Sequence, residues 1–342
     1  MKYLLFTGCS YGQQERAFRD LKNMGFLKDV ITYNLQGSSL GSRYQLYSAI
    51  NLIEKIKNTG VPTEDIYLVC QWSSAFRVTT IYDIKNYKNA VYNYKNIDLN
   101  TWALSENCGL YSVGIDDFGF MNTTNQINTI RTYRDDKNLR EFLIDNLPKT
   151  SPEDRMIQYH LDIMNLQNYL KVNDIKYSFL FFNSSLTGFN FDRSDSFLNG
   201  LEIKNVQSIT GVDVIEENDG NKKFKLPKIW KESIIYNNKK WEPFEKLIDW
   251  TNFILYENDR IKYGGIDEFT LENIGEVAYL TYKQKPVSFG DHLNQYGDFR
   301  YIIESGLFKK VNKEFIHDNE INIESYKNIS TNDYNKLTKK HI

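Results

Sequence analysis

The first 75 residues alternate short apolar segments with segments of helical spacing, and this alternation is the strongest constraint on the fold. Strands are predicted over residues 2–6, 30–35 and 65–72, and helices over residues 13–24 and 44–56. The third strand is the clearest, because its run of β-branched and apolar residues is typical of a strand buried on both faces. Three strand-loop-helix units in succession predict a parallel sheet under helices, a three-layer α/β/α fold.

The alternation resumes after residue 150. Ser151-Pro152-Glu153-Asp154 is a typical helix start, because Ser serves as N-cap, Pro suits the first turn and acidic side chains favour the helix N-terminus. The helix is expected to reach about Val172, and a buried strand is expected over residues 174–182. The stretch 81–150, rich in Tyr and Asn, is interpreted as a lid or extended loops. Further helices are expected over residues 137–146, 241–256 and 264–283 and from about Phe299.

Composition divides the chain into four parts. Residues 1–183 form the first part of the α/β core, and residues 241–311 complete it with the loop that carries His292. The segment 184–240 contains clusters of Gly, Asn, Asp and Lys and is predicted to be an insertion or subdomain that faces solvent. Residues 312–342 are polar and are predicted to form an extended C-terminal tail.

The balance of charge argues against several function classes. Lys and Arg number 42 against 44 Asp and Glu, a formal net charge of −2 that gives no general attraction to nucleic acid or anionic lipid. No apolar run approaches the roughly 18 residues that a membrane-spanning helix needs. We therefore expect no nucleic-acid partner and no membrane partner. With no signal peptide recognised, a cytoplasmic location is expected.

Cys9, Cys70 and Cys108 are widely spaced, with neither a CxxC pair nor a nearby His. This pattern favours neither a disulfide framework nor a zinc site, and it fits a reducing compartment. The sequence also has no Walker-type or dinucleotide-binding glycine loop. We therefore predict a protein with no metal and no cofactor.

Reactive groups in open α/β sheets gather at the carboxyl ends of the strands, so the loops there hold the candidate site. Ser10 follows the first strand, Gly37 the second, and Trp72-Ser73 the third. A serine hydroxyl between a strand and a helix can lie near free backbone N–H groups, and it becomes a nucleophile when a base takes its proton. Only one of the four histidines, His292, stands in a Gly-flanked loop, so its imidazole is the candidate base. A helix-capping serine and a surface histidine are the structural alternatives.

Three sequence blocks together are more specific than any one of these residues. They read Gly8-Cys9-Ser10-Tyr11-Gly12 after the first strand, Gly37-Ser38-Ser39 after the second, and Asp291-His292-Leu293-Asn294 before a late helix. In this combination the chain resembles the SGNH (GDSL-type) hydrolases. The run Gln71-Trp72-Ser73-Ser74-Ala75-Phe76-Arg77 resembles the divergent branch that is common in phage proteins. The resemblance covers about residues 1–80, 151–183 and 275–310.

The resemblance implies a role for each residue of the candidate site. Ser10 is the implied nucleophile and His292 the implied general base. The backbone N–H groups of Ser10 and Gly37 are the implied oxyanion donors.

The chain departs from the family at two positions. Family members usually carry an oxyanion Asn after the third strand, where this chain has Trp72 and Ser73 as the oxyanion or substrate residues. They usually carry the acid that orients the histidine three residues before it. That position is Phe289 here, and Asp291, directly before the His, is the remaining candidate acid.

Two functions from different classes follow. The first is a serine esterase or deacetylase that cleaves a small acyl ester, for example on a glycan, through an acyl-enzyme on Ser10. The alternative is a phage virion or accessory protein that kept the hydrolase fold without catalysis and binds virion or homo-oligomer partners, with the virion as its location. The chemistry of the site must decide, because one fold hosts many functions.

Overall fold

The structure is a computed structural model of the 342-residue chain. The residues that it describes are 1–9, 14–37, 41–72, 77–83, 103–105, 108–114, 152–182, 213–216, 222–225, 242–257, 263–280, 292–317 and 323–339. The helix predicted over residues 137–146 and most of the predicted insertion, 184–240, lie outside these ranges.

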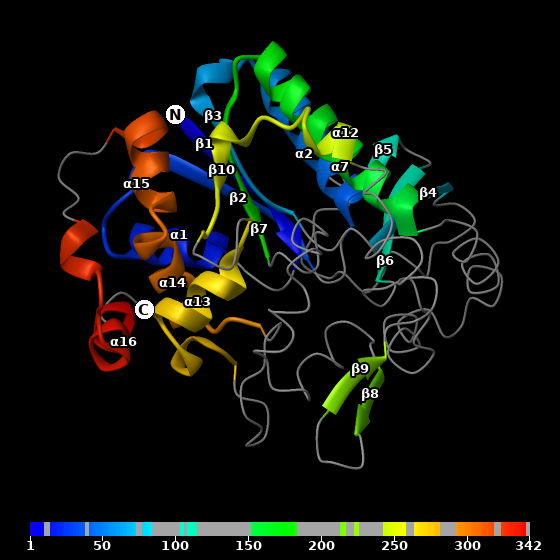
Figure 1. The fold of residues 1–342 in the computed structure, drawn as a ribbon. Coiled ribbons are helices and arrows are strands. Elements are labelled where there is room, and N and C mark those ends of the chain that lie inside the picture. The colour runs from blue at the N-terminus through cyan, green and yellow to red at the C-terminus, as the bar shows by residue number, and fades with distance from the viewer. Residues whose placement is uncertain are drawn as a thin grey trace.

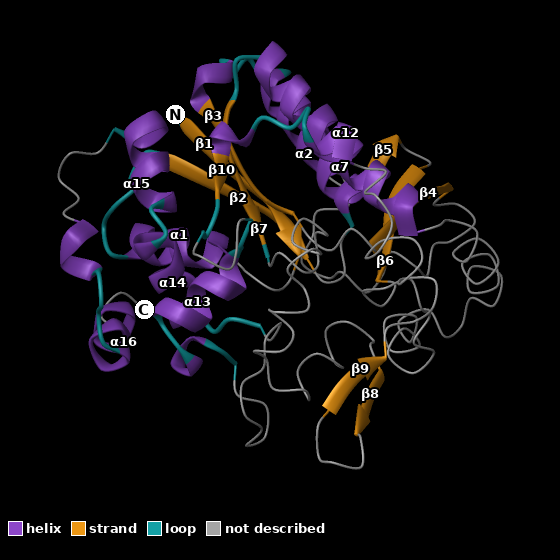
Figure 2. Ribbon diagram, viewed as in Figure 1, coloured by secondary structure: helices purple, strands orange, loops and turns teal. Residues whose placement is uncertain are grey.

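Five parallel strands form the central sheet, in the order β10-β7-β3-β1-β2 (Figure 1, Figure 2). They are β1 (Lys2–Cys9), β2 (Val30–Gly37), β3 (Ile66–Trp72), β7 (Lys176–Phe181) and β10 (Phe253–Ile254). β1 pairs with β2 on one side and with β3 on the other. The chain therefore adds β2 at one side of β1 and all later strands of the sheet at the other side. The predicted α/β fold with a parallel sheet is confirmed.

Helices cover both faces of this sheet. α2 (Ser42–Lys57) and α7 (Pro152–Val172) pack on one face, and α1 (Gln14–Asn23), α14 (Gln295–Glu304) and α15 (Leu307–Val311) pack on the other (Figure 1). A helix that packs one apolar side on a sheet repeats its apolar residues with helical spacing, which is why the sequence located α1 and α2. α7 was located by its start signal at Ser151-Pro152.

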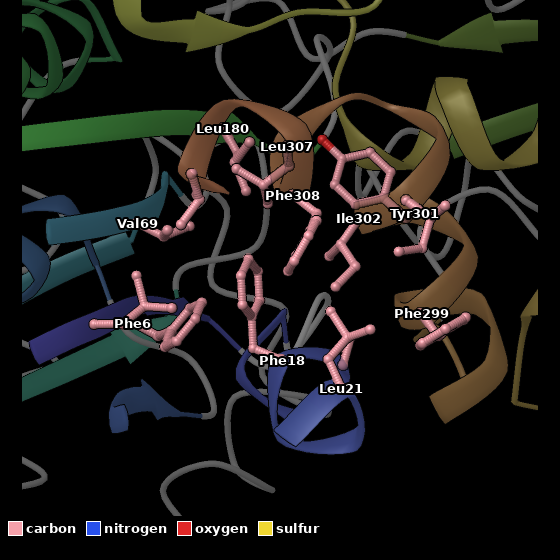
Figure 3. Close-up of a cluster of buried hydrophobic side chains, with 14 of the residues drawn as sticks. Phe6, Phe18, Leu21, Val69, Leu180, Phe299, Tyr301, Ile302, Leu307 and Phe308 are labelled. Atoms are coloured by element: carbon pink, nitrogen blue, oxygen red, sulfur yellow. The ribbon is translucent and has the colours of Figure 1, made fainter. Parts of the chain in front are cut away.

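Alternation along the strands divides the core between the two faces. In β1, Leu5 faces α2 and α7, whereas Leu4 and Phe6 face α1 and α14. Figure 3 shows the second of these cores, where side chains from β1, α1, α14 and α15 meet. Phe18 of α1 packs on Phe308 of α15 with ring centroids 5.6 Å apart. C-terminal helices therefore complete a core that the first two elements begin.

The other described elements lie outside the central sheet and the five helices named above. Among strands they are β4 (Arg77–Asp83), β5 (Ala103–Ser105) and β6 (Cys108–Gly114), an antiparallel sheet in the order β4-β6-β5, and the antiparallel pair β8 (Asp213–Glu216) and β9 (Lys222–Lys225). Among helices they are α12 (Glu242–Glu245), α13 (Ile266–Asn273), α16 (Thr331–Lys339), the π-helix η8 (Asn312–Ile316) and the 3-10 helices η1 (Thr63–Asp65), η6 (Trp250–Asn252), η7 (Glu276–Ala278) and η9 (Ile323–Tyr326).

Residues 241–256, predicted as one helix, form α12, η6 and the edge strand β10 instead. Trp250 and Phe253 pack against Phe181 of β7, with ring centroids 6.2 and 5.1 Å away. The apolar residues of this segment have helical spacing, but they pack at the edge of the sheet beside β7. This tertiary packing outweighs the local preference for a helix.

Residues 264–283, predicted as one helix, break after α13. Gly275 follows with a φ of 82°, a left-handed conformation that suits glycine and ends the helix. The chain then forms η7.

The segment 312–342, predicted as an extended tail, contains the helices η8, η9 and α16 in its described part. Phe315 and Tyr334 are buried, with 2% and 3% of their surface exposed. The ammonium groups of Lys2 and Lys176 donate to main-chain carbonyls of η8. The segment is therefore part of the folded core, because its few apolar side chains find partners in distant elements.

None of the helices within the described ranges combines the length and the apolar character that crossing a bilayer requires.

Candidate functional site

The carboxyl ends of β1 and β3 mark the place where a doubly wound sheet binds its ligands. The helix that follows β1, α1, covers one face of the sheet, and the next described helix after β3, α7, covers the other. The connections therefore diverge at this point, and ligands of such folds enter between them.

The structure describes only part of the predicted site. Ser10, Ser73 and Asp291 lie outside the described residues. Gly37 is the last residue of β2 and pairs with Cys9 of β1, which places its backbone at the carboxyl edge. The pairing of Ser10 with His292 therefore stays a prediction.

Trp72, predicted to lie at the oxyanion or substrate position, is a core residue instead. Its side chain is 0% exposed and packs edge-on against Tyr159 of α7 and Phe179 of β7, with ring centroids 6.1 and 5.3 Å away. Strand alternation explains this placement, because Trp72 shares a face of β3 with Leu68 and Cys70, which point toward α2 and α7. A side chain enclosed there does not reach a substrate at the sheet edge, so the structure corrects this assignment.

His292 is half-buried and is held by its main chain. Its carbonyl accepts a hydrogen bond from the N–H of Leu280 at 2.9 Å, and the next residue, Leu293, forms an antiparallel bridge with Tyr279. Tyr279 and Leu293 are buried in the core below α1 and α14. The main chain of His292 is therefore anchored beside this core, and its side chain is half-buried.

Asn294 fixes the start of α14, earlier than the predicted start at Phe299. Its Oδ1 accepts a hydrogen bond from the N–H of Gly297 at 2.8 Å, and its Nδ2 donates to the carbonyl of Tyr279 at 2.9 Å. Gly297 packs directly on η7, where a Cβ would lie 2.1 Å from the carbonyl oxygen of Ala278. The chain next to His292 is therefore anchored to η7.

A buried ion pair joins α1 to α14. Arg16, in the first turn of α1, donates to Asp298, in the first turn of α14, at 2.8 Å, and Asp298 is 0% exposed. One turn further along α1, the carboxylate of Asp20 accepts a hydrogen bond from the side-chain amide of Gln295 at 2.9 Å. The two helices thus contact each other through polar side chains near the start of α14, of which Asp20 and Asp298 are buried.

The carboxyl groups of α1 lie in a desolvated environment. Burial raises the pKa of Glu15, against the opposing effect of Arg19. Burial also raises the pKa of Asp20, against the opposing hydrogen bonds from Tyr334 and Gln295. Both carboxyls therefore hold a proton more tightly than free carboxyls do.

Sequence reasoning missed a group of buried glutamines at the carboxyl edge. The side-chain amide of Gln36 donates to Oε1 of Gln14 at 2.7 Å, and that of Gln45 donates to the main-chain carbonyl of Gln71 at 2.9 Å. Glutamine is mostly a surface residue, so its type alone gives no sign of burial. The one available signal was the position of Gln71 inside the apolar run of the third predicted strand.

A second buried polar group ties α2 to α7. The hydroxyl of Ser42 donates to Oδ2 of Asp162 at 2.7 Å, and the amide of Gln158 donates to Oδ1 at 2.7 Å. Burial raises the pKa of Asp162, while these hydrogen bonds and the nearby Arg43 oppose the rise. We assign this group to helix packing, since its partners come from two helices of one layer.

Other chemistry-bearing residues do not add to the candidate site. In the described part of the chain, no three His, Cys, Asp or Glu side chains come together as a metal-binding group. His160 is buried within α7, His317 ends η8 with a φ of 60°, and His341 lies outside the described residues. His292 therefore remains the candidate base.

A cavity of about 830 Å³ lies at the opposite, amino edge of the sheet. Lys2, Val30 and Asp65, at or beside the starts of β1, β2 and β3, line it. No residue of the candidate site lines this cavity, so we do not connect it with the predicted chemistry.

The strand order, the helices on both faces and the reversal between β1 and β3 define an α/β protein with a doubly wound, flavodoxin-like sheet. Comparison of the chain with protein-family models and with curated proteins gave no match. The resemblance to the SGNH hydrolases therefore rests on the sequence motifs alone.

Proposed function

We propose that the chain is a serine esterase or deacetylase of the SGNH type that acts on a small acyl ester, for example one carried by a glycan. The observation that carries the proposal is the contact between α1 and α14, joined by the buried pair Arg16–Asp298. α1 begins four residues after Ser10, and α14 begins three residues after His292.

The lengths of the two connections support a meeting of the candidate groups. An extended chain spans at most about 3.5 Å per residue, so Ser10 lies within about 14 Å of the start of α1 and His292 within about 10 Å of the start of α14. These bounds allow the two side chains to meet, with Gln295, the first residue of α14, in contact with Asp20, six residues into α1. The meeting itself is part of the proposal.

In the proposed reaction, Oγ of Ser10 attacks the acyl carbonyl carbon while the imidazole of His292 takes the hydroxyl proton. That proton passes to the leaving alcohol oxygen as the ester bond breaks, which leaves the acyl group on Ser10. His292 then takes a proton from water, and the resulting hydroxide attacks the acyl carbon. The bond between that carbon and Oγ of Ser10 breaks, the carboxylic acid leaves, and the proton returns from His292 to Oγ. The backbone N–H groups of Ser10 and Gly37 stabilise the oxyanion in both steps.

Two further roles complete the proposal. With Trp72 in the core, Ser73 is the proposed third oxyanion donor at the end of β3. Asp291 is the proposed acid beside His292, where its charge stabilises the imidazolium that forms during the reaction.

Labelling with a fluorophosphonate probe tests the nucleophile and the base. We expect the wild-type protein to be labelled, Ser10→Ala to abolish labelling, and His292→Ala to slow it by about a hundredfold or more. His341→Ala is the matched histidine control and should label at the wild-type rate. Turnover of a short-chain aryl ester should follow the same pattern. Labelling that survives Ser10→Ala would refute the assignment.

A second candidate function is a role in assembly, as a phage virion or accessory protein that binds virion partners or its own copies. The burial of Trp72 favours it, because one of the two residues that stand in place of the oxyanion Asn of the family is then enclosed in the core, away from a substrate. This candidate predicts a folded wild-type protein that no probe labels and that sediments as a homo-oligomer or with virions. The proposed location is the virion in that case and the cytoplasm for the esterase.

A further inference from the structure

The end of β1 lies between two buried glutamines. Gly8 pairs in register with Gln36 of β2, and on its other side it faces Gln71 of β3. A Cβ placed on Gly8 would lie 3.0 Å from both Cβ and Oε1 of Gln71, which is 0% exposed. The side chain of Gln71 therefore occupies the space that a side chain at position 8 would need.

Hydrogen bonds tie these glutamines to both helical layers. The side-chain amide of Gln36 donates to Gln14 of α1 at 2.7 Å, and the main-chain carbonyl of Gln71 accepts from Gln45 of α2 at 2.9 Å. Because α1 and α2 lie on opposite faces of the sheet, the row Gln36-Gly8-Gln71 is linked to both faces. The side chain of Gln36 makes its own hydrogen bond, which restricts the end of β2. The hydrogen bond of Gln71 is made by its main chain, so the side chain of Gln71 acts on Gly8 through their close contact.

We propose that Gln36 and Gln71 are positioning residues that set the backbone of Gly8, two residues before Ser10. The consequence for catalysis rests on the proposed function, whereas the positioning itself is a property of the end of β1. A carboxamide suits this task because it fills the space over a glycine and can also donate and accept hydrogen bonds.

Hydrogen exchange tests the positioning without reference to catalysis. Gln71→Met keeps the length of the side chain and removes the amide, and we expect amide exchange at Thr7 to Cys9 to become at least tenfold faster. Gln167→Met is the matched control, since Gln167 is equally buried in α7 and donates to the main-chain carbonyl of Asp249 at 2.6 Å. This control should leave exchange at the end of β1 unchanged.

Gly8→Ala tests the contact between Gly8 and Gln71 by changing Gly8 instead of Gln71. Its Cβ would press on Cβ and on the main-chain oxygen of Gln71, which are 3.0 and 3.1 Å away. We expect the same acceleration of exchange as in Gln71→Met. Agreement of the two variants would assign the effect to this contact.

Fluorophosphonate labelling tests the catalytic consequence. We expect Gln71→Met to slow labelling of Ser10 at least tenfold. Gln71→Glu provides a rescue, because a protonated carboxyl group has one donor and one acceptor, whereas a buried carboxylate is an uncompensated charge. We therefore expect the labelling rate of Gln71→Glu, divided by that of the wild type, to rise as the pH falls. A variant that only loses packing would show no such dependence on pH.

The outcomes separate the two proposals. Unchanged exchange in both Gln71→Met and Gly8→Ala overturns the positioning role. Faster exchange in these variants, with a wild type that is not labelled, supports the positioning role and overturns the proposed function. Faster exchange with undiminished labelling overturns the catalytic consequence. If Gln71→Met does not fold, Gly8→Ala and Gln71→Glu at low pH provide the same comparisons.

Discussion

At the scale of single residues, Gly297 has no room for a larger side chain. A Cβ there would lie 2.1 Å from the carbonyl oxygen of Ala278, a main-chain atom that moves only with η7. We expect Gly297→Ala to lower the free energy of unfolding by about 3 kcal/mol, as overpacking does in tightly packed sites. Urea unfolding measures this loss. Lys309→Ala, at an exposed position of α15, should change stability by no more than about 0.5 kcal/mol. Equal stability of Gly297→Ala and the wild type would contradict this packing.

Asp249 makes stability depend on pH with a definite sign. The ammonium group of Lys171, 2.6 Å away, and the N–H of Thr251 hold the pKa of Asp249 at about 2, below its ordinary value of 3.8. A carboxyl group whose pKa is lower in the folded state stabilises the fold above its unfolded pKa, and that stabilisation is lost as the pH falls toward 2.

Asp249→Asn removes this contribution. Both side chains of the pair are partly exposed, so we expect a loss of about 1 kcal/mol or less at pH 7. Urea unfolding of the variant and the wild type at pH 7 and at pH 3 measures the effect. The difference between them should shrink at pH 3, and a difference that does not change with pH would contradict the assignment.

At the scale of elements, a hydrogen bond ties α16 to α1. The hydroxyl of Tyr334 donates to Oδ2 of Asp20 at 2.6 Å, and its ring packs on Phe299 with centroids 5.1 Å apart. Burial raises the pKa of Asp20, and this hydrogen bond opposes the rise, so the bond contributes most when the carboxylate is ionised.

We expect Tyr334→Phe to lower the free energy of unfolding by about 1.5–3 kcal/mol at neutral pH, and by less in acid. Tyr326→Phe is the matched control in the same segment, because the hydroxyl of Tyr326 makes no hydrogen bond with the residues that the structure describes. Thermal unfolding of both variants at pH 7 and pH 4 measures the losses. Equal losses would show that the contact with Asp20 contributes no stability.

The sequence predicted best the elements whose signals are local. β1, β2, β3, α1 and α2 have their own apolar periods, and α7 begins at the predicted Pro152. β10 was missed because a strand of two residues is too short to show an alternation of apolar and polar residues. These residues form a strand only through their pairing with β7. The tail was predicted wrongly because the burial of Tyr334 depends on residues such as Asp20, 314 positions away.

The candidate site was harder to predict than the fold. Trp72 ends a strand, which suggested a place at the edge, but the alternation of β3 turns its side chain into the core. The burial of Gln36 and Gln71 follows from contacts between layers, and a polar residue type gives no sign of such contacts. The motifs around Ser10 and His292 predict a catalytic pair, and this pairing stays a prediction because Ser10 lies outside the described residues.

At the scale of the whole molecule, one ion pair joins the N-terminal and C-terminal parts of the chain. Arg16 and Asp298 are 282 residues apart in sequence. Because Asp298 is fully buried, Arg16→Met removes the ion-pair partner of a charge in the core, and we expect a loss of about 3–5 kcal/mol in the free energy of unfolding.

A double-mutant cycle with Asp298→Leu measures this coupling by urea unfolding. The double variant buries no charge at this place and should be more stable than Arg16→Met alone. Losses that simply add would show that the two side chains do not stabilise each other.

The packing of α14 and α15 over β1 and α1 has a consequence for synthesis. Phe18 leaves the ribosome about 290 residues before its partner Phe308. At a translation rate of about 5–20 residues per second, the apolar face of α1 stays uncovered for tens of seconds. We therefore expect the nascent chain to need a chaperone during translation, and chains released before residue 295 to aggregate.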